Sequence, residues 1–152
     1  MTTYLRSITH LSRSALILVA GLLLSACSGS TTPEAALRSQ LQEMQTAASE
    51  GRPADFMQGI TDDFVGNAGT DRAALHNLLR MQALGKSRIG VTTGPLDVQM
   101  QGDRATVRFT AVLTGGSGRL LPDSVQSYSI TSGWRMQDDE WHVYYAQWEP
   151  NL

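Results

Sequence analysis

Cys27 is the only thiol in this chain of 152 residues, and it has the clearest potential for covalent chemistry. A cysteine sulfur is a far better nucleophile than the hydroxyl groups of serine and threonine. Cys27 follows two small residues, Ser25 and Ala26, at the end of an apolar run. Because a lone cysteine cannot form an intrachain disulfide, a folded domain that follows it must be held together by its core.

The other residue types that often do chemistry do not form a recognisable site. His10, His76 and His142 lie far apart, without the spacing of metal ligands. The glycine-rich residues 115–118 follow a predicted strand and lead into another strand, so no helix amino terminus is available to hold a phosphate. We predict a hairpin loop there, and we predict no metal and no cofactor.

The amino-terminal segment has the charge order of a secretory signal. Arg6 and Arg13 precede the uncharged run 15–24, and the first acidic residue is Glu34. The alternative is a membrane-spanning helix, but residues 14–26 would extend only about 20 Å at ~1.5 Å per residue, against a hydrocarbon core of ~30 Å. We therefore predict a cleaved signal peptide over residues 1–26.

The sequence Leu24-Ser25-Ala26-Cys27 resembles the lipobox of bacterial lipoproteins. The resemblance implies cleavage between Ala26 and Cys27, a diacylglycerol thioether on the sulfur and a fatty acid such as palmitate on the new amine. Several acyl chains make a long-lived anchor. Ser28 stands where an aspartate would signal retention in the inner membrane, so the resemblance implies the outer membrane, facing the periplasm. The alternative is an ordinary cleaved signal with an unmodified cysteine.

Beyond the signal, residues 27–32 read as a short lipidated tether and residues 33–152 as one domain. Without Arg6 and Arg13 the chain carries 10 basic and 14 acidic residues, a formal net charge of -4. We find no basic patch in the sequence, and we predict no nucleic-acid partner.

Three helices are predicted in the first half of the domain. The first begins at Pro33 with Thr32 as its cap and ends near Gly51. The second begins near Pro53 and continues to the loop at 66–69, because its apolar side chains recur with helical spacing. Those side chains are Phe56, Met57, Ile60 and Phe64. The third runs from residue 70 or 71 to Gly85.

After Lys86 the apolar residues alternate with polar ones, as in strands. We predict a strand over residues 89–100 that bends at Gly94-Pro95, and further strands over 105–111, 124–136 and 141–148. The aromatic rings of Trp141 and Trp148 could face outward on the convex side of the sheet. The order predicts an α+β fold in which three helices cover one face of a curved antiparallel sheet of four or more strands.

Three segments resemble the nuclear transport factor 2-like (NTF2-like) superfamily, which includes SnoaL-type cyclases and ketosteroid isomerase. They are residues 60–65, 133–136 and 140–143. The resemblance spans roughly residues 33–149 and implies a cone that encloses a pocket, and a possible homodimer through the sheet. Our candidates for the pocket wall are aromatic, although each is also suited to plain core packing. They are Phe56, Phe64, Phe109, Tyr128 and Trp134.

Ketosteroid isomerase uses an Asp base and an oxyanion hole made of a Tyr and a protonated Asp. No residue here matches that set by motif. Asp62 or Asp63 can be proposed as the base and Tyr128 or Tyr144 as the donor, but adjacent aspartates are also typical of a solvated helix end. Our leading hypothesis is a non-catalytic lipoprotein that binds a small apolar ligand or an envelope protein. The alternative is a SnoaL-like isomerase, cyclase or dehydratase acting on a hydrophobic molecule.

Overall fold

The computed structural model describes residues 31–85, 88–116 and 124–151. The predicted signal peptide, Cys27 and residues 117–118 of the predicted glycine loop lie outside these residues, and Gly115 and Gly116 form the end of a strand. Within them the chain forms α-helices α2 (Pro33–Ser49), α3 (Pro53–Gln58) and α4 (Arg72–Leu84), and a short 3-10 helix, η1 (Asn67–Gly69). In the described part of the chain, no helix is both long and apolar enough to cross a membrane.

Helix α2 begins and ends where its capping residues predict. The Thr32 hydroxyl accepts a hydrogen bond from the Ala35 amide at 3.2 Å, and Pro33 occupies the first turn. Gly51, at φ 64°, turns the chain out of the helix in a conformation that favours glycine. The buried stripe of α2 has the spacing of one helix face. Its residues are Leu37, Leu41, Met44 and Ala47.

Helix α4 also confirms its predicted bounds, but it packs loosely. The Asp71 carboxylate caps it by accepting from the Ala74 amide at 2.8 Å, and Gly85 follows its last residue. Leu75 and Leu79 pack partly against the core, but no residue of α4 is fully buried. Other contacts must therefore hold this helix in place.

Strand β1 (Ile60–Val65) corrects the predicted second helix, which ends at Gln58 instead of continuing to Phe64. Gly59 ends α3, and a Cβ atom there would lie 2.5 Å from the Met44 sulfur of α2, so a larger residue would force the Met44 side chain to move. The chain then pairs in parallel with the distant strand β6 (Glu140–Pro150), starting at Ile60 opposite Val143. The sheet is antiparallel as predicted except at β1, a strand that was not predicted from the sequence and that adds one parallel pairing at the sheet edge.

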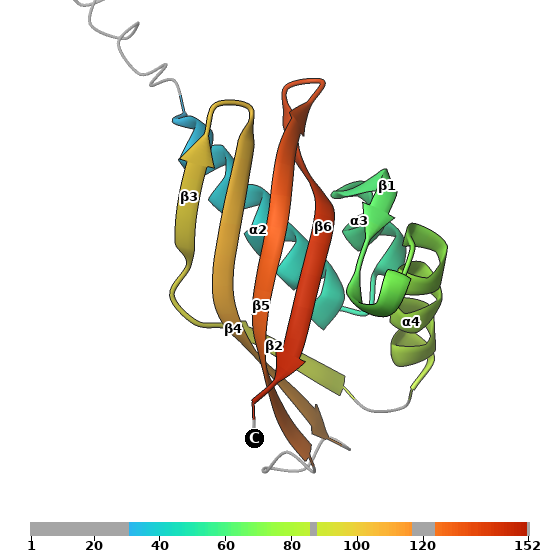
Figure 1. Ribbon diagram of the computed structural model, residues 1–152. Coiled ribbons are helices and arrows are strands. Elements are labelled where there is room, and N and C mark those ends of the chain that lie inside the picture. Colours follow the sequence, from blue (N-terminus) through green and yellow to red (C-terminus); the bar gives the residue numbers. More distant parts are fainter. Residues whose placement is uncertain (1–30, 86–87, 117–123, 152) are drawn as a thin grey trace, which may run out of the picture. The chain divides into compact units, whose positions relative to one another are not determined.

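The remaining strands are β2 (Arg88–Thr93), β3 (Asp97–Gln101), β4 (Arg104–Gly116) and β5 (Ser124–Gln137). The six strands form one sheet in the order β1-β6-β5-β4-β2, and β3 also pairs with β4 (Figure 1). The predicted strand over 89–100 is thus two strands, β2 and β3, which pair with opposite ends of β4. The break lies at Gly94-Pro95, where the Gly94 amide donates to the Thr110 carbonyl at 2.8 Å.

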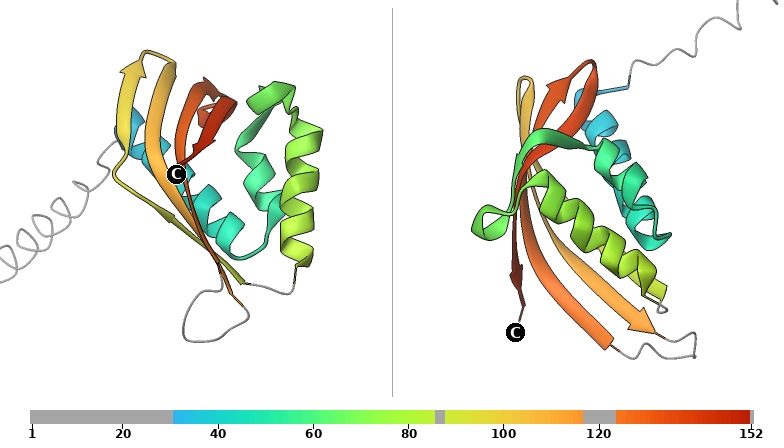
Figure 2. Two further views of the ribbon diagram at one scale, coloured as in Figure 1. Left: turned by 60° about the horizontal axis from the view of Figure 1, so that its bottom comes forward. Right: turned by 90° about the vertical axis from the view of Figure 1, so that its right-hand side faces the viewer.

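The three helices lie on one side of the sheet, as predicted (Figure 2). The core between the layers includes Leu37, Val107 and Trp134. Trp141 also belongs to this core, 2% exposed, and its indole Nε1 donates to the Pro33 carbonyl at 2.9 Å. The interpretation of Trp141 as a convex-side residue was therefore wrong.

Candidate ligand-binding face

The strand register decides which side chains point toward the helices. Successive residues of a strand point to opposite sides, and residues paired across strands share a side. Trp134 is buried in the core, so the residues in its alternation and their partners face the helices. We call the part of this side that continues past the core the inner face. It consists of Val91, Thr93, Phe109, Ala111, Leu113, Gln126, Tyr128, Ile130, Trp148 and Pro150.

The inner face is mainly apolar and remains partly accessible. Its polar side chains are Thr93, Gln126 and Tyr128. Phe109, Ile130 and Trp148 form one row across β4, β5 and β6, and each ring or side chain is only half-buried. The Gln45 amide closes one side of this face, since it donates to the Val91 carbonyl at 2.9 Å and accepts from the Thr93 hydroxyl at 3.1 Å. Both ends of that amide are therefore hydrogen-bonded.

Charged side chains of strands β3 to β6 lie on the opposite side of the sheet, which we call the outer face. None of the described residues of these four strands that point toward the helices is charged. The charged residues and the histidine of the outer face are Asp97, Arg104, Arg108, Arg135, Glu140, His142 and Glu149. The sheet thus separates an uncharged inner face from a charged outer face.

Asp63 lies on the outer face in an ion pair. Its carboxylate accepts two hydrogen bonds from the Arg135 guanidinium, at 2.6 and 2.9 Å. The Tyr144 ring lies beside this pair, 5.7 Å from the Arg135 guanidinium carbon and 5.8 Å from that of Arg104. Gly133 makes room for that ring, because a Cβ atom there would lie 2.9 Å from the Tyr144 Cζ atom.

This environment makes Asp63 a poor general base. The hydrogen bonds from Arg135 lower the pKa of Asp63 from 3.8 to about 2. A general base works best with a pKa near the operating pH. Asp62 extends fully into solvent, 3.6 Å from the Arg72 guanidinium. Of the four residues considered for acid and base roles, the inner face holds Tyr128 but not Asp63 or Tyr144.

The five candidate wall residues divide between core and inner face. Phe64 and Trp134 are each 2% exposed within the core, and Phe56 packs against it from α3. Phe109 and Tyr128 lie on the inner face, where the structure adds Ile130 and Trp148 beside them. The alternation of residues along β5 already placed Ile130 with Tyr128. Trp148 pairs with Ile130 and faces the helices, so its interpretation as a convex-side residue was wrong.

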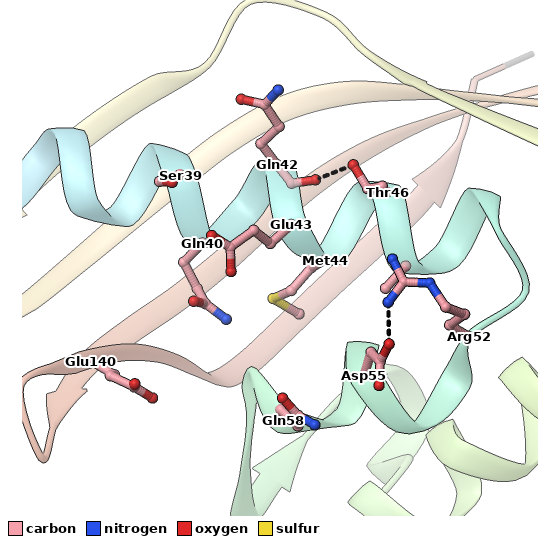
Figure 3. Close-up of a pocket in the computed structure, with 11 residues that line it drawn as sticks. Ser39, Gln40, Gln42, Glu43, Met44, Thr46, Arg52, Asp55, Gln58 and Glu140 are labelled. Carbon is pink, nitrogen blue, oxygen red and sulfur yellow. Dashed lines mark hydrogen bonds and ion pairs between the residues drawn. The ribbon is translucent and has the colours of Figure 1, made fainter.

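A separate groove of about 720 Å³ lies between α2 and α3 and is bounded at one end by Glu140 (Figure 3). Its lining is mostly polar and includes Gln40, Glu43, Asp55 and Gln58. Arg52, also in the lining, forms ion pairs with Glu50 and Asp55. These side chains do not suit an apolar ligand, and the groove lies apart from the inner face.

The ion pair predicts a pH dependence of stability. Because the pKa of Asp63 is lower in the folded chain, its stabilising effect is present above about pH 4 and is lost as the pH falls toward about 2. We expect Asp63→Asn to lower the chemical-denaturation midpoint modestly at pH 7, because the pair is exposed, and to reduce the fall of that midpoint between about pH 4 and 2 by the same amount. Asp62→Asn is the matched control, and an equal change in both variants would contradict the assignment.

Comparison with solved structures identifies the fold. A protein of unknown function from Pseudomonas putida, described as NTF2-like, is 18% identical with a TM-score of 0.69, covering 81% of this chain and 89% of that one. The fold is NTF2-like. A scytalone dehydratase-like protein from Novosphingobium aromaticivorans also has a TM-score of 0.69 at 13% identity, covering 77% of this chain and 83% of that one.

Part of a longer protein also resembles this chain in structure, at low sequence identity. Bd1075 from Bdellovibrio bacteriovorus is 12% identical with a TM-score of 0.66, covering 76% of this chain but only 40% of its own length. No family model and no curated protein sequence matches this chain. At these identities the likeness establishes the NTF2-like fold alone.

Proposed function

We propose that this chain is a lipid-anchored protein of the bacterial cell envelope, placed on the periplasmic side of the outer membrane, whose inner face binds a small apolar ligand without transforming it. The lipobox-like residues 24–27 support the anchor. The observation that carries the binding role is the separation of charge across the sheet, with apolar side chains half-exposed on the inner face. A concave apolar surface with few polar groups is typical of small-molecule sites.

Binding is favoured over catalysis because both candidate bases, Asp62 and Asp63, lie away from the inner face, which holds only the candidate donor Tyr128. The NTF2-like proteins of similar structure include dehydratase-like ones, and such chemistry needs a group that moves protons next to the substrate. The Asp63 carboxylate is paired with Arg135 on the outer face, and Asp62 extends into solvent. The Gln45 amide beside the inner face is engaged by Val91 and Thr93 and does not titrate.

Native mass spectrometry of the detergent-extracted protein tests the binding role directly. We expect a small apolar molecule to remain bound to the wild-type chain. Ile130→Asp places a carboxylate on the inner face and should reduce the ligand-bound fraction at least about ten-fold, equivalent to ~1.4 kcal/mol. Thr131→Asp puts the same group on the outer face and is the matched control. A wild-type spectrum without a retained ligand, or equal loss in both variants, would refute the binding role.

The anchor is tested by the same measurement on a different variant. The wild-type mass should correspond to a chain that begins at Cys27 and carries a diacylglycerol and a further acyl group. Cys27→Ser removes the only thiol, so we expect a full-length, unacylated precursor. Normal processing of this variant, or a free thiol in the mature wild-type protein, would exclude the lipid anchor but leave the binding role untouched.

A further inference from the structure

Helix α4 exposes three large apolar side chains that the fold does not use. Leu78, Met81 and Leu84 are 50%, 71% and 81% exposed. At ~3.6 residues per turn they span about a third of the helix circumference. We call them the α4 stripe. Several large apolar side chains exposed together on one element usually mark an interaction site.

The position of α4 does not depend on this stripe. The Arg72 guanidinium donates to the carbonyls of Met57, at 3.1 Å, and Ile60, at 3.3 Å, which fixes the start of α4 against α3 and β1. Leu75 and Leu79 supply its contacts with the core. The stripe is therefore available for a partner without any rearrangement of the fold.

The charges of α4 differ from those of the rest of the domain. The helix contains Arg72 and Arg80 but no aspartate or glutamate between Arg72 and Leu84, whereas the chain after the predicted signal has a net charge of -4. Arg72 is held by the Met57 and Ile60 carbonyls near Asp62, whereas Arg80 lies one turn before Leu84, beside the stripe. An apolar stripe with a basic neighbour suits a helix that lies on an anionic lipid surface.

The short tether places a lipid surface within reach. From Cys27 to Pro33 there are six residue steps, which extend at most about 20 Å. Pro33 begins α2, and α2 belongs to the same layer as α4 (Figure 2). The far end of α2 leads to Gly51, where a Cβ atom would lie 3.7 Å from the Cβ of Ala83 in α4. Helix α2 thus connects the attachment point of the tether with α4 on the helical side of the sheet.

We infer that the α4 stripe rests on the membrane surface to which Cys27 is attached, so that the helical layer faces the lipid and the charged outer face of the sheet points away. This inference rests on the proposed lipid anchor. The partner that we infer for the α4 stripe is a bilayer with anionic headgroups. A second copy of this chain and a protein partner are the competing occupants.

Because Cys27 is the only native cysteine, a fluorophore can be attached at one chosen position. In the acylated protein Cys27 has no free thiol, so Met81→Cys introduces one labelling position for an environment-sensitive NBD fluorophore. The full lipidated chain is reconstituted in vesicles of phosphatidylethanolamine and phosphatidylglycerol, some of them carrying nitroxide-labelled acyl chains. Thr110→Cys, exposed on the outer face, is the matched control.

We expect the label at position 81 to shift its emission to shorter wavelengths and to be quenched by the nitroxide lipids at least about two-fold more than the label at 110. Equal quenching at both positions overturns the inference and leaves the anchor standing. Self-quenching at 81 that rises with protein density, without lipid quenching, overturns it in favour of a second copy. Incorporation of two labels per chain shows that Cys27 is free, so the anchor itself has failed.

Discussion

Replacement of Trp134 by alanine should lower the free energy of unfolding by about 3–5 kcal/mol. The Trp134 side chain is 2% exposed on β5, between its neighbours β4 and β6 in the sheet. Its indole Nε1 donates to the Ser132 hydroxyl at 2.9 Å, and that hydroxyl donates to the Val107 carbonyl at 3.3 Å. The substitution removes a large buried surface and disturbs a buried polar pair. Equilibrium unfolding in guanidinium chloride, followed by circular dichroism, measures the loss.

Trp148→Ala is the matched control for that experiment. Trp148 lies on the inner face and is only half-buried, outside the main core cluster. Because part of its surface already contacts water, we expect less than about half of the destabilisation seen at Trp134. Equal costs at the two positions would contradict the distinction between core and inner face.

Gly66→Ala should lower the free energy of unfolding by about 1–3 kcal/mol through steric overlap. A Cβ atom at Gly66 would lie 2.9 and 3.1 Å from two ring atoms of Trp148, and 3.2 Å from the Phe64 ring. Two aromatic rings cannot yield as a flexible side chain would. The backbone is not the cause, because Gly66 has φ -108°, which alanine adopts readily.

The same variant should also displace the Trp148 ring on the inner face, which tryptophan fluorescence would report. Gly94→Ala is the matched control. The nearest atom to its Cβ would be the Thr110 carbonyl oxygen at 3.6 Å, an ordinary contact, so we expect a nearly unchanged denaturation midpoint. Comparable losses at both glycines would show that Trp148 does not pack over Gly66.

The features that could be predicted from the sequence are those with local causes. Thr32 and Pro33 start α2, and Asp71 starts α4, because a capping group acts on amides within one turn of itself. Alternation along β5 correctly placed Tyr128, Ile130 and Trp134 on one side, since successive strand residues point in opposite directions. The α+β class follows from these local patterns.

The features that could not be predicted depend on residue pairs far apart in the chain. Residues 60–65 have helical spacing by themselves, but their pairing with β6 and the approach of Met44 to Gly59 make them a strand. Asp63 resembles a free base until Arg135, 72 positions away, binds it. Trp141 lies in the core, whereas Trp148 shares the inner face with Ile130. Local sequence patterns account for where elements begin and which side chains alternate, whereas long-range packing determines which side chains form the core and which stay partly exposed on the inner face.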